Sequence, residues 1–299
     1  MSKHGILIKS EDVLEEKYKV LDHIASGGMS EVYLVEEVDK HNPQRWAVKV
    51  ANKDNKLSQK LIDETKILSE LEHPNIPRII DFFSTEDYIF LVMEYAAGEV
   101  LTEYLNENDY KLPLTAVIEL GIQLCDILEY LHNRSEPIIY RDIKPGNIIM
   151  KKNGEMKLID FGISRKFREE KLRDTVKIGT VGFAAPEQFE QKQTDQRTDL
   201  FSMGALLYYI LSQGKYVYIA QKPISHYSNK LPKSLIKCIN QLVELEPNKR
   251  LQHASDAKKL LVKALNETNR KGISIYVTLT VGMAILVFMV GFLSSFILM

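Results

Sequence analysis

The sequence predicts an α+β protein of two lobes, a small strand-rich lobe followed by a larger helical lobe, with one hydrophobic helix at the C-terminal end. Short apolar runs with β-branched residues fill the region of about 18–95, whereas apolar residues at helical spacing dominate about 96–265. The chain has 299 residues, of which 45% are hydrophobic, so it is long enough to bury a sizeable core.

The small lobe is expected to contain strands over 18–24, 32–38 and 46–50, with the text ASGGMSE between the first two. A helix is expected in SQKLIDETKILSELEHPNI, because Leu61, Leu68 and Leu71 recur near the helical period and Pro74 stops it. The segment YIFLVMEYAAG predicts another strand, and its small residues at 96–98 mark the boundary between the lobes.

The larger lobe is predicted to begin with a long amphipathic helix in LTAVIELGIQLCDILEYLHNR. The text IIMKKNGEMKLI predicts a hairpin, since Asn153 and Gly154 separate two apolar runs. The segment TDLFSMGALLYYILSQG predicts a helix that is buried on most sides and ends at Gly214.

The overall charge excludes one class of partner. Lys and Arg number 39 against 40 Asp and Glu, which gives no electrostatic reason to expect nucleic acid. Cys125 and Cys238 lie far apart and match no metal spacing, so buried free thiols in a reducing compartment are expected.

The C-terminal end has the composition of a membrane span. Residues 273–299 contain no charged side chain, and a helix needs only about 20 apolar residues to cross the hydrocarbon core. We therefore expect a linker over 266–272 and a transmembrane helix over 273–297. Basic residues precede the span and none follows it, so the large N-terminal part is expected in the cytoplasm and the C-terminus on the opposite face of the cell membrane. The first 20 residues have no apolar run long enough for a secretory signal.

A polar cluster interrupts two buried runs in IIYRDIKPGNIIM, residues 138–150. Taken alone, it could be an ordinary polar loop. Along the chain, however, the motifs follow one another as a glycine-containing loop, AVK, a helix with Glu, RDxKxxN, DFG and APE. This ordered set resembles the protein-kinase superfamily over about 18–265. GGMSEV resembles bacterial serine/threonine kinases of the eukaryotic (Hanks) type, here expected to lack an extracellular sensor domain.

The resemblance implies the bilobal protein-kinase fold, with an N-lobe of about 18–95, and assigns a task to each charged motif residue. Lys49 matches the strand lysine that holds the α- and β-phosphates of ATP, with Glu64 as its counter-ion. Asp142 matches the catalytic carboxylate that orients the substrate hydroxyl, and Lys144 the lysine that steadies the γ-phosphate. The expected metal ligands, for Mg²⁺ or alternatively Mn²⁺, are the oxygen donors of Asn147 and Asp160.

The same resemblance predicts where ATP is held. Adenine is expected to bond the backbone of Glu94 and Ala96, with Met93 guarding the back of the pocket. The remaining expected nucleotide contacts are Ile24, Ala25, Gly27, Gly28, Val32, Ala47 and Ile149.

Further residues match structural and regulatory positions of the family. Glu187 is expected to pair with Arg250, and Asp199 to brace the catalytic loop, as buried charges.

Lys144 and Pro145 resemble the serine/threonine class, in which Thr180 would bond the catalytic Asp and Lys. Thr175 is the best candidate for autophosphorylation, with Arg141 as the partner of its phosphate; the alternative is an unmodified loop residue.

The sequence departs from the family pattern at three places. Ala25 and Ser30 replace two glycines of the GxGxxG loop, Tyr140 replaces the usual histidine before Arg-Asp, and Phe201 replaces a tryptophan. Tyr140 is interpreted as a structural substitution, because the residue at this position bonds to the DFG segment rather than to the transferred group.

The main hypothesis is a membrane-anchored serine/threonine protein kinase that acts on protein hydroxyls. The alternatives are a pseudokinase that serves as a scaffold, disfavoured because the catalytic set is complete, and a small-molecule kinase, disfavoured by APE and the long activation loop. Membrane lipid is an expected partner, and Gly291 and Ser295 weakly suggest pairing into a homodimer.

Overall fold

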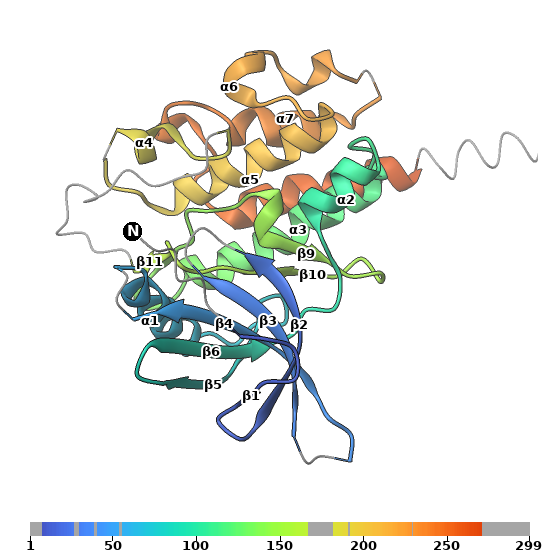
Figure 1. Cartoon of the computed structure of the whole chain (residues 1–299). Coiled ribbons are helices and arrows are strands. Elements are labelled where there is room, and N and C mark those ends of the chain that lie inside the picture. The colour runs from blue at the N-terminus through green and yellow to red at the C-terminus, as the bar shows by residue number, and fades with distance from the viewer. Residues whose placement is uncertain are drawn as a thin grey trace, which may run out of the picture.

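The computed structural model describes residues 8–26, 30–38, 41–53, 56–166, 182–190, 192–228 and 230–270. Figure 1 shows two lobes, one built around a twisted sheet and one built of helices. The two-lobe α+β architecture predicted from the sequence is therefore confirmed in the described part of the chain.

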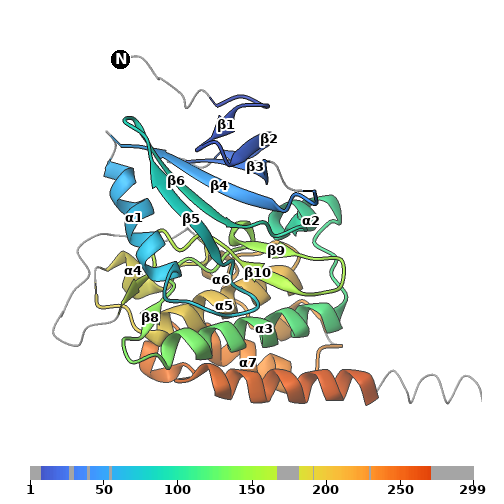
Figure 2. The same ribbon diagram turned by 90° about the horizontal axis from the view of Figure 1, so that it is seen from below.

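The N-terminal lobe contains an antiparallel sheet in the order β1-β2-β3-β4-β6-β5. Its strands are β1 (Val13–Leu14), β2 (Tyr18–Ser26), β3 (Glu31–Glu37), β4 (Arg45–Asn52), β5 (Ile79–Ser84) and β6 (Tyr88–Glu94). Alternate residues of the central strands, such as Val35, Val48 and Val50, are fully buried, which is the pattern of a sheet packed on a core. Helix α1 (Lys56–Leu68) lies beside this sheet (Figure 2).

The strand β5 was not predicted from the sequence, since IIDFFS is a short apolar run without alternation. Strand β4 supplies the chain's one tryptophan, Trp46, which pairs in register with Glu94 of β6. The indole N–H of Trp46 is buried and has no hydrogen-bond acceptor among the described residues.

The C-terminal lobe is mainly helical, as predicted. Its helices are α2 (Leu101–Glu107), α3 (Leu114–His132), α4 (Pro186–Phe189), α5 (Gln196–Leu211), α6 (Val217–Ala220), α7 (Lys233–Leu242) and a terminal helix over 254–270. Its short strands are β7 (Glu99–Val100), β8 (Ile138–Ile139), β9 (Ile148–Met150), β10 (Met156–Leu158) and β11 (Arg165–Lys166).

Helix α5 is the centre of the larger lobe. All its residues from Thr198 to Tyr208 are buried, so the prediction of a helix covered on most sides is confirmed. A Cβ atom on Gly204 would lie 2.4 Å from the Cβ of Leu242, so only glycine lets α7 approach this closely. The predicted hairpin at Asn153–Gly154 joins β9 to β10, and Gly154 adopts a φ of 84° in the turn.

Two further expectations concern cysteines and the membrane. Cys125 and Cys238 are buried free thiols, as predicted. Among the described residues, no helix is both long enough and apolar enough to cross a membrane. The span predicted over 273–297 lies outside the described residues.

Candidate active site

A cavity of about 430 Å³ lies between the two lobes. Its walls include most of the residues predicted to contact ATP: Ile24, Ala25, Val32, Ala47, Lys49, Met93, Glu94, Ala96 and Ile149. Gly27 and Gly28 lie outside the described residues. The structure adds lining residues that the sequence reasoning missed, which are Ser26, Pro77, Tyr95, Gly98, Val100, Glu103, Gly146 and Ile159.

Gly98 fixes the shape of the link between the lobes. A Cβ atom at this position would lie 2.4 Å from the carbonyl oxygen of Met150 and 2.8 Å from the Ile149 side chain. Glycine is therefore required here, because the connection from β6 must pass directly over β9. This contact holds Ile149 against the cavity that both segments line.

Lys49 connects three elements at the back of the cavity. Its Nζ lies 2.6 Å from Oε2 of Glu64 on α1 and 2.9 Å from Oδ1 of Asp160, which follows β10. The amide N–H of Phe161 donates to the second oxygen of Glu64 at 3.1 Å. One buried glutamate thus ties the lysine of β4 to the backbone of the DFG segment.

Lys49 and Asp160 favour each other's charged forms, whereas burial raises the pKa of Glu64 above its ordinary value. Burial alone would lower the pKa of Lys49, but the carboxylates of Glu64 and Asp160 outweigh burial and raise it above its ordinary value. Burial would raise the pKa of Asp160, yet Lys49 holds it below its ordinary value. The lysine is therefore cationic and Asp160 anionic at neutral pH.

The catalytic loop places three polar side chains together. Oδ2 of Asp142 accepts a hydrogen bond from Nζ of Lys144 at 2.7 Å and one from the amide nitrogen of Asn147 at 2.9 Å. The same amide nitrogen donates to the backbone carbonyl of Asp142 at 2.9 Å. The amide nitrogen of Asn147 is therefore engaged with Asp142, which leaves its carbonyl oxygen as the ligand atom for a cation.

A divalent cation fits the donors that border the cavity. Asn147 and Asp160 both line it and offer oxygen atoms, the ligands that Mg²⁺ prefers. Among the described residues, no cluster of three or more His, Cys, Asp or Glu side chains could hold a metal on its own. Two protein donors alone are too few to hold a cation, so Asn147 and Asp160 would fit one that nucleotide phosphates also bind.

The carboxylate of Asp199 hydrogen-bonds to the backbone of the catalytic loop. It is fully buried and accepts hydrogen bonds from the backbone N–H of Tyr140 at 2.9 Å and of Arg141 at 2.7 Å. His132 Nε2 lies 2.8 Å from the same carboxylate. Arg141 has a φ of 69°, which is unfavourable for a side chain of this size, so the two amide contacts stabilise a strained backbone.

Tyr140 reaches the DFG segment through its hydroxyl. The phenol donates to the carbonyl of Ile159, the residue before Asp160, at 2.5 Å, and its ring packs edge-on against Phe161 at 5.0 Å. Burial raises the pKa of Tyr140 well above its ordinary value, so the group remains a neutral donor. The contact is the kind of structural bond that the sequence analysis expects at this position.

Glu187 of α4 forms a bidentate salt bridge with Arg250. The two guanidinium nitrogens lie 2.7 Å and 2.8 Å from the two carboxylate oxygens, and Thr198 donates to Oε1 of Glu187 at 2.9 Å. The Arg250 side chain has no exposed surface.

Arg141 is almost entirely buried, and its Nε donates to the carbonyl of Ile163 at 3.0 Å. Its expected partner Thr175, and Thr180, both lie outside the described residues.

One ion pair near the cavity was missed by the sequence reasoning. Lys157 of β10 is buried, and its Nζ lies 2.8 Å from Oε1 of Glu94 at the end of β6. Its place in the hairpin text KNGEMKLI gives no indication of a partner in the other lobe, because that contact depends on how the lobes meet. The pair joins the last residue of the N-terminal sheet to the larger lobe.

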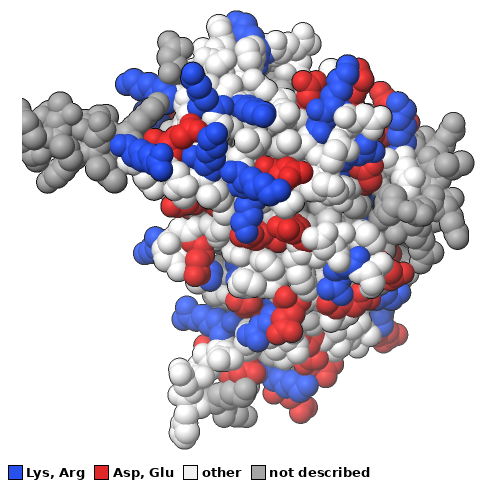
Figure 3. All heavy atoms as spheres, turned by 180° about the vertical axis from the view of Figure 1, so that it is seen from behind, with Lys and Arg blue, Asp and Glu red and all other residues white. Residues whose placement is uncertain are grey.

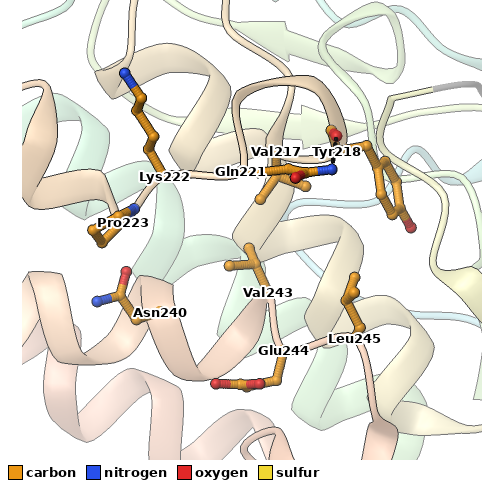
Figure 4. Close-up of a pocket in the computed structure, with 9 residues that line it drawn as sticks. All are labelled: Val217, Tyr218, Gln221, Lys222, Pro223, Asn240, Val243, Glu244 and Leu245. Atoms are coloured by element: carbon orange, nitrogen blue, oxygen red, sulfur yellow. Dashed lines mark hydrogen bonds between the residues drawn. The ribbon is translucent and has the colours of Figure 1, made fainter.

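A second cavity, of about 510 Å³, lies in the larger lobe between α6 and α7 (Figure 4). Val217, Val243 and Leu245 give it an apolar side, and Lys222, Asn240 and Glu244 supply polar groups. None of the residues predicted for catalysis or ATP binding lines this cavity.

Comparison with known proteins identifies the family. Residues 18–280 match the model of the protein kinase domain. This chain belongs to the protein kinase family. The resemblance to bacterial serine/threonine kinases is likewise confirmed by the relatives that it matches.

Three bacterial relatives illustrate the extent of that similarity. A probable serine/threonine-protein kinase of Clostridium perfringens is 29% identical over 82% of this chain and 38% of its own length. Serine/threonine-protein kinase pkn2 of Myxococcus xanthus is 31% identical over 84% of this chain and 33% of its length. A probable serine/threonine-protein kinase of Streptomyces coelicolor is 34% identical over 66% of the chain and 30% of its length. The kinase chain described here thus spans about a third of these relatives.

Proposed function

We propose that this kinase transfers the γ-phosphoryl group of ATP to serine or threonine hydroxyls of proteins. The observation that carries the proposal is the pair of charge networks at the cavity, Lys49 with Glu64 and Asp160 on one side, and Asp142 with Lys144 and Asn147 on the other. Phosphoryl transfer requires chiefly positioning and neutralisation of phosphate charge, and these two networks supply both.

The residues of the two networks divide the tasks of the reaction in this proposal. Lys49, held by Glu64, binds the α- and β-phosphates, and Asp160 with Asn147 holds Mg²⁺ against them. Asp142 lies on the catalytic loop and orients the attacking hydroxyl, while Lys144 balances charge on the transferred group. The bound metal supplies neutralisation of charge between the phosphates.

The class of substrate is proposed from the loop sequence and from the relatives. Lys144 and Pro145 follow the serine/threonine pattern, and the bacterial relatives carry that name. Autophosphorylation at Thr175, with Arg141 as the partner of the phosphate, belongs to the same proposal.

We further propose that residues 273–297 anchor the kinase in the cell membrane with its catalytic part in the cytoplasm, and that the chain can pair through this segment. The support for anchoring is the uncharged composition of the segment and the basic residues before it.

The test is a labelling reaction with the full chain in detergent, γ-labelled ATP, Mg²⁺ and a generic basic protein. We expect label on the substrate, and its loss in Asp142→Asn. Asp256→Asn serves as the matched control, because this aspartate lies on the terminal helix and pairs with Lys259. Equal labelling by wild type and Asp142→Asn, or none by either, would refute the enzyme assignment.

A further inference from the structure

The surface of the larger lobe carries an uneven distribution of charge. Between Asp199 and Glu244 the chain contains five lysines and no acidic residue, although the whole chain has a net charge of only −1. All five lysines, at positions 215, 222, 230, 233 and 237, are exposed. The excess of positive charge is therefore local, and its place in the fold determines what it can bind.

Three of these lysines lie in the first half of α7 or just before it. Lys233 and Lys237 are one helical turn apart, and Lys230 precedes the helix. Within the described residues, none of the three forms an ion pair with a carboxylate, so their charges are not neutralised by the protein. A positive surface of this kind attracts a partner with negative charge.

The terminal helix extends this surface. It packs beside α7, with Sγ of Cys238 3.8 Å from the carbonyl of Ala257. Lys258 pairs with Asp126 and Lys259 with Asp256, whereas Lys263 and Arg270 have no carboxylate partner among the described residues.

Figure 1 shows that the segment entering α7 lies on the side where the terminal helix leaves the described part. Figure 3, which shows the molecule from behind, shows several Lys and Arg side chains at the upper left, on that same side, with Asp and Glu side chains among them. We define the basic face as Lys230, Lys233, Lys237, Lys263 and Arg270.

We propose that this basic face lies against an anionic lipid surface. The argument for lipid as the occupant is the position of the chain's uncharged segment, which begins at Ile273. Arg270 is three residues from that point, a distance of at most about 11 Å along an extended chain. Lys263 is two helical turns earlier, about 10 Å along the axis. A membrane entered at residue 273 therefore lies close to Arg270, and the terminal helix that carries Lys263 and packs beside α7 leads directly to it.

With the basic face against lipid, the catalytic domain has a defined orientation on the membrane. The larger lobe would contact lipid through α7 and the terminal helix. The N-terminal lobe, which lies on the far side of the molecule from α7 in Figure 1, would point away from the membrane. The inference rests on the proposed membrane anchor and goes beyond it, because an anchor alone sets no orientation of the catalytic domain.

The experiment compares the full chain in two kinds of vesicle, phosphatidylcholine alone and phosphatidylcholine mixed with phosphatidylglycerol. A short pulse of an amine-acetylating reagent, followed by mass spectrometry, measures the reaction rate of each lysine. We expect Lys230, Lys233 and Lys237 to react about fivefold more slowly in the anionic vesicles, the equivalent of about 1 kcal/mol per residue. Lys17 and Lys66, which are exposed in the N-terminal lobe, should react equally in both.

The double variant Lys233→Glu, Lys237→Glu tests the face directly. It should abolish the slower reaction at Lys230, whereas Lys17→Glu with Lys66→Glu should leave it intact. High salt should also abolish it in the wild type.

Equal rates in the two vesicle types would overturn the proposal, and so would equal slowing at Lys17 and Lys66. Slowing by a soluble polyanion as strong as that by anionic vesicles would also overturn it, assigning the face to a soluble acidic partner. Flotation with both vesicle types reports the anchor separately, and kinase labelling by the double variant reports the transfer reaction separately.

Discussion

The hydroxyl of Tyr140 can be removed with little other change, which makes Tyr140→Phe a sharp test of how the DFG segment is held. The phenylalanine ring can keep the edge-on contact with Phe161 at 5.0 Å, while the hydrogen bond to the carbonyl of Ile159 is lost. The perturbation therefore removes one hydroxyl from a fully buried site and leaves the packing in place.

The magnitude follows from the partial burial of this hydrogen bond. A buried polar group that loses its partner costs about 1–3 kcal/mol, with the lower end expected where water can reach the acceptor, as it can at the cavity-lining Ile159. Ile159 directly precedes Asp160, so the lost hydrogen bond destabilises the arrangement in which Asp160 faces the cavity. The population of that arrangement decreases by about tenfold for each 1.4 kcal/mol. We expect kcat/KM to fall by roughly five- to a hundredfold, and the free energy of unfolding to fall by no more than about 3 kcal/mol.

The assay is the steady-state rate of phosphate transfer with varied ATP, beside thermal unfolding followed by circular dichroism. Tyr209→Phe is the matched control, since its hydroxyl bonds to that of Tyr110 at 3.3 Å, outside the cleft, and its loss should leave the rate unchanged. Complete loss of activity in Tyr140→Phe would show that the phenol takes part in the reaction. No change in either rate or stability would show that the hydrogen bond does not hold the segment. Tyr140→His is expected to stay within about tenfold of wild type, roughly 1.4 kcal/mol in barrier.

Three other predictions follow from the contacts of Arg250, Gly98 and Asp160. Arg250→Met leaves the carboxylate of Glu187 buried without its cation and should lower the free energy of unfolding by about 3–5 kcal/mol; denaturant melts that shift no more than those of the exposed control Lys249→Met would contradict this. Gly98→Ala puts a Cβ 2.4 Å from the Met150 carbonyl, so we expect severalfold weaker ATP binding by calorimetry. Gly154→Ala should leave ATP binding unchanged, because its strain at a φ of 84° lies in a turn that does not line the cavity. The pKa of Asp160 is lower in the folded protein than its ordinary value of 3.8. The ionised carboxylate therefore stabilises the fold above pH 3.8, and this stabilisation is lost as the pH falls from 3.8 through the pKa of the folded state. The difference in unfolding free energy between wild type and Asp160→Asn should then be constant from neutral pH to about 3.8, and a decline beginning nearer neutrality would refute it.

Local motifs predicted which residues would meet at the cavity, because each motif fixes a short stretch of backbone. Lys49 and Asp160 are 111 positions apart in the chain, yet the ordered motifs place both at one site, and the structure brings them within 2.9 Å. The roles assigned to these residues remain predictions of the family resemblance.

Other features depend on how distant elements pack and have no local pattern. The ion pair of Lys157 with Glu94 exists only because β10 meets the end of β6, and a lysine in a hairpin is ordinarily solvated. The need for glycine at position 98 arises from the approach of β9, which the text AAG does not reveal. The acceptor for Tyr140 is a backbone carbonyl, and a backbone carbonyl has no residue type that a sequence could indicate.

The position of the lone tryptophan has a practical consequence for optical work on this kinase. Trp46 packs against the buried cluster of the N-terminal sheet, on the face opposite Ala47 and Lys49, and its partly buried indole is the one tryptophan fluorophore in the chain. Its emission therefore comes from a single environment in the N-terminal lobe, without contributions from the helical lobe. Unfolding of the N-terminal lobe can be followed by this intrinsic fluorescence, and no extrinsic dye or added cysteine is required.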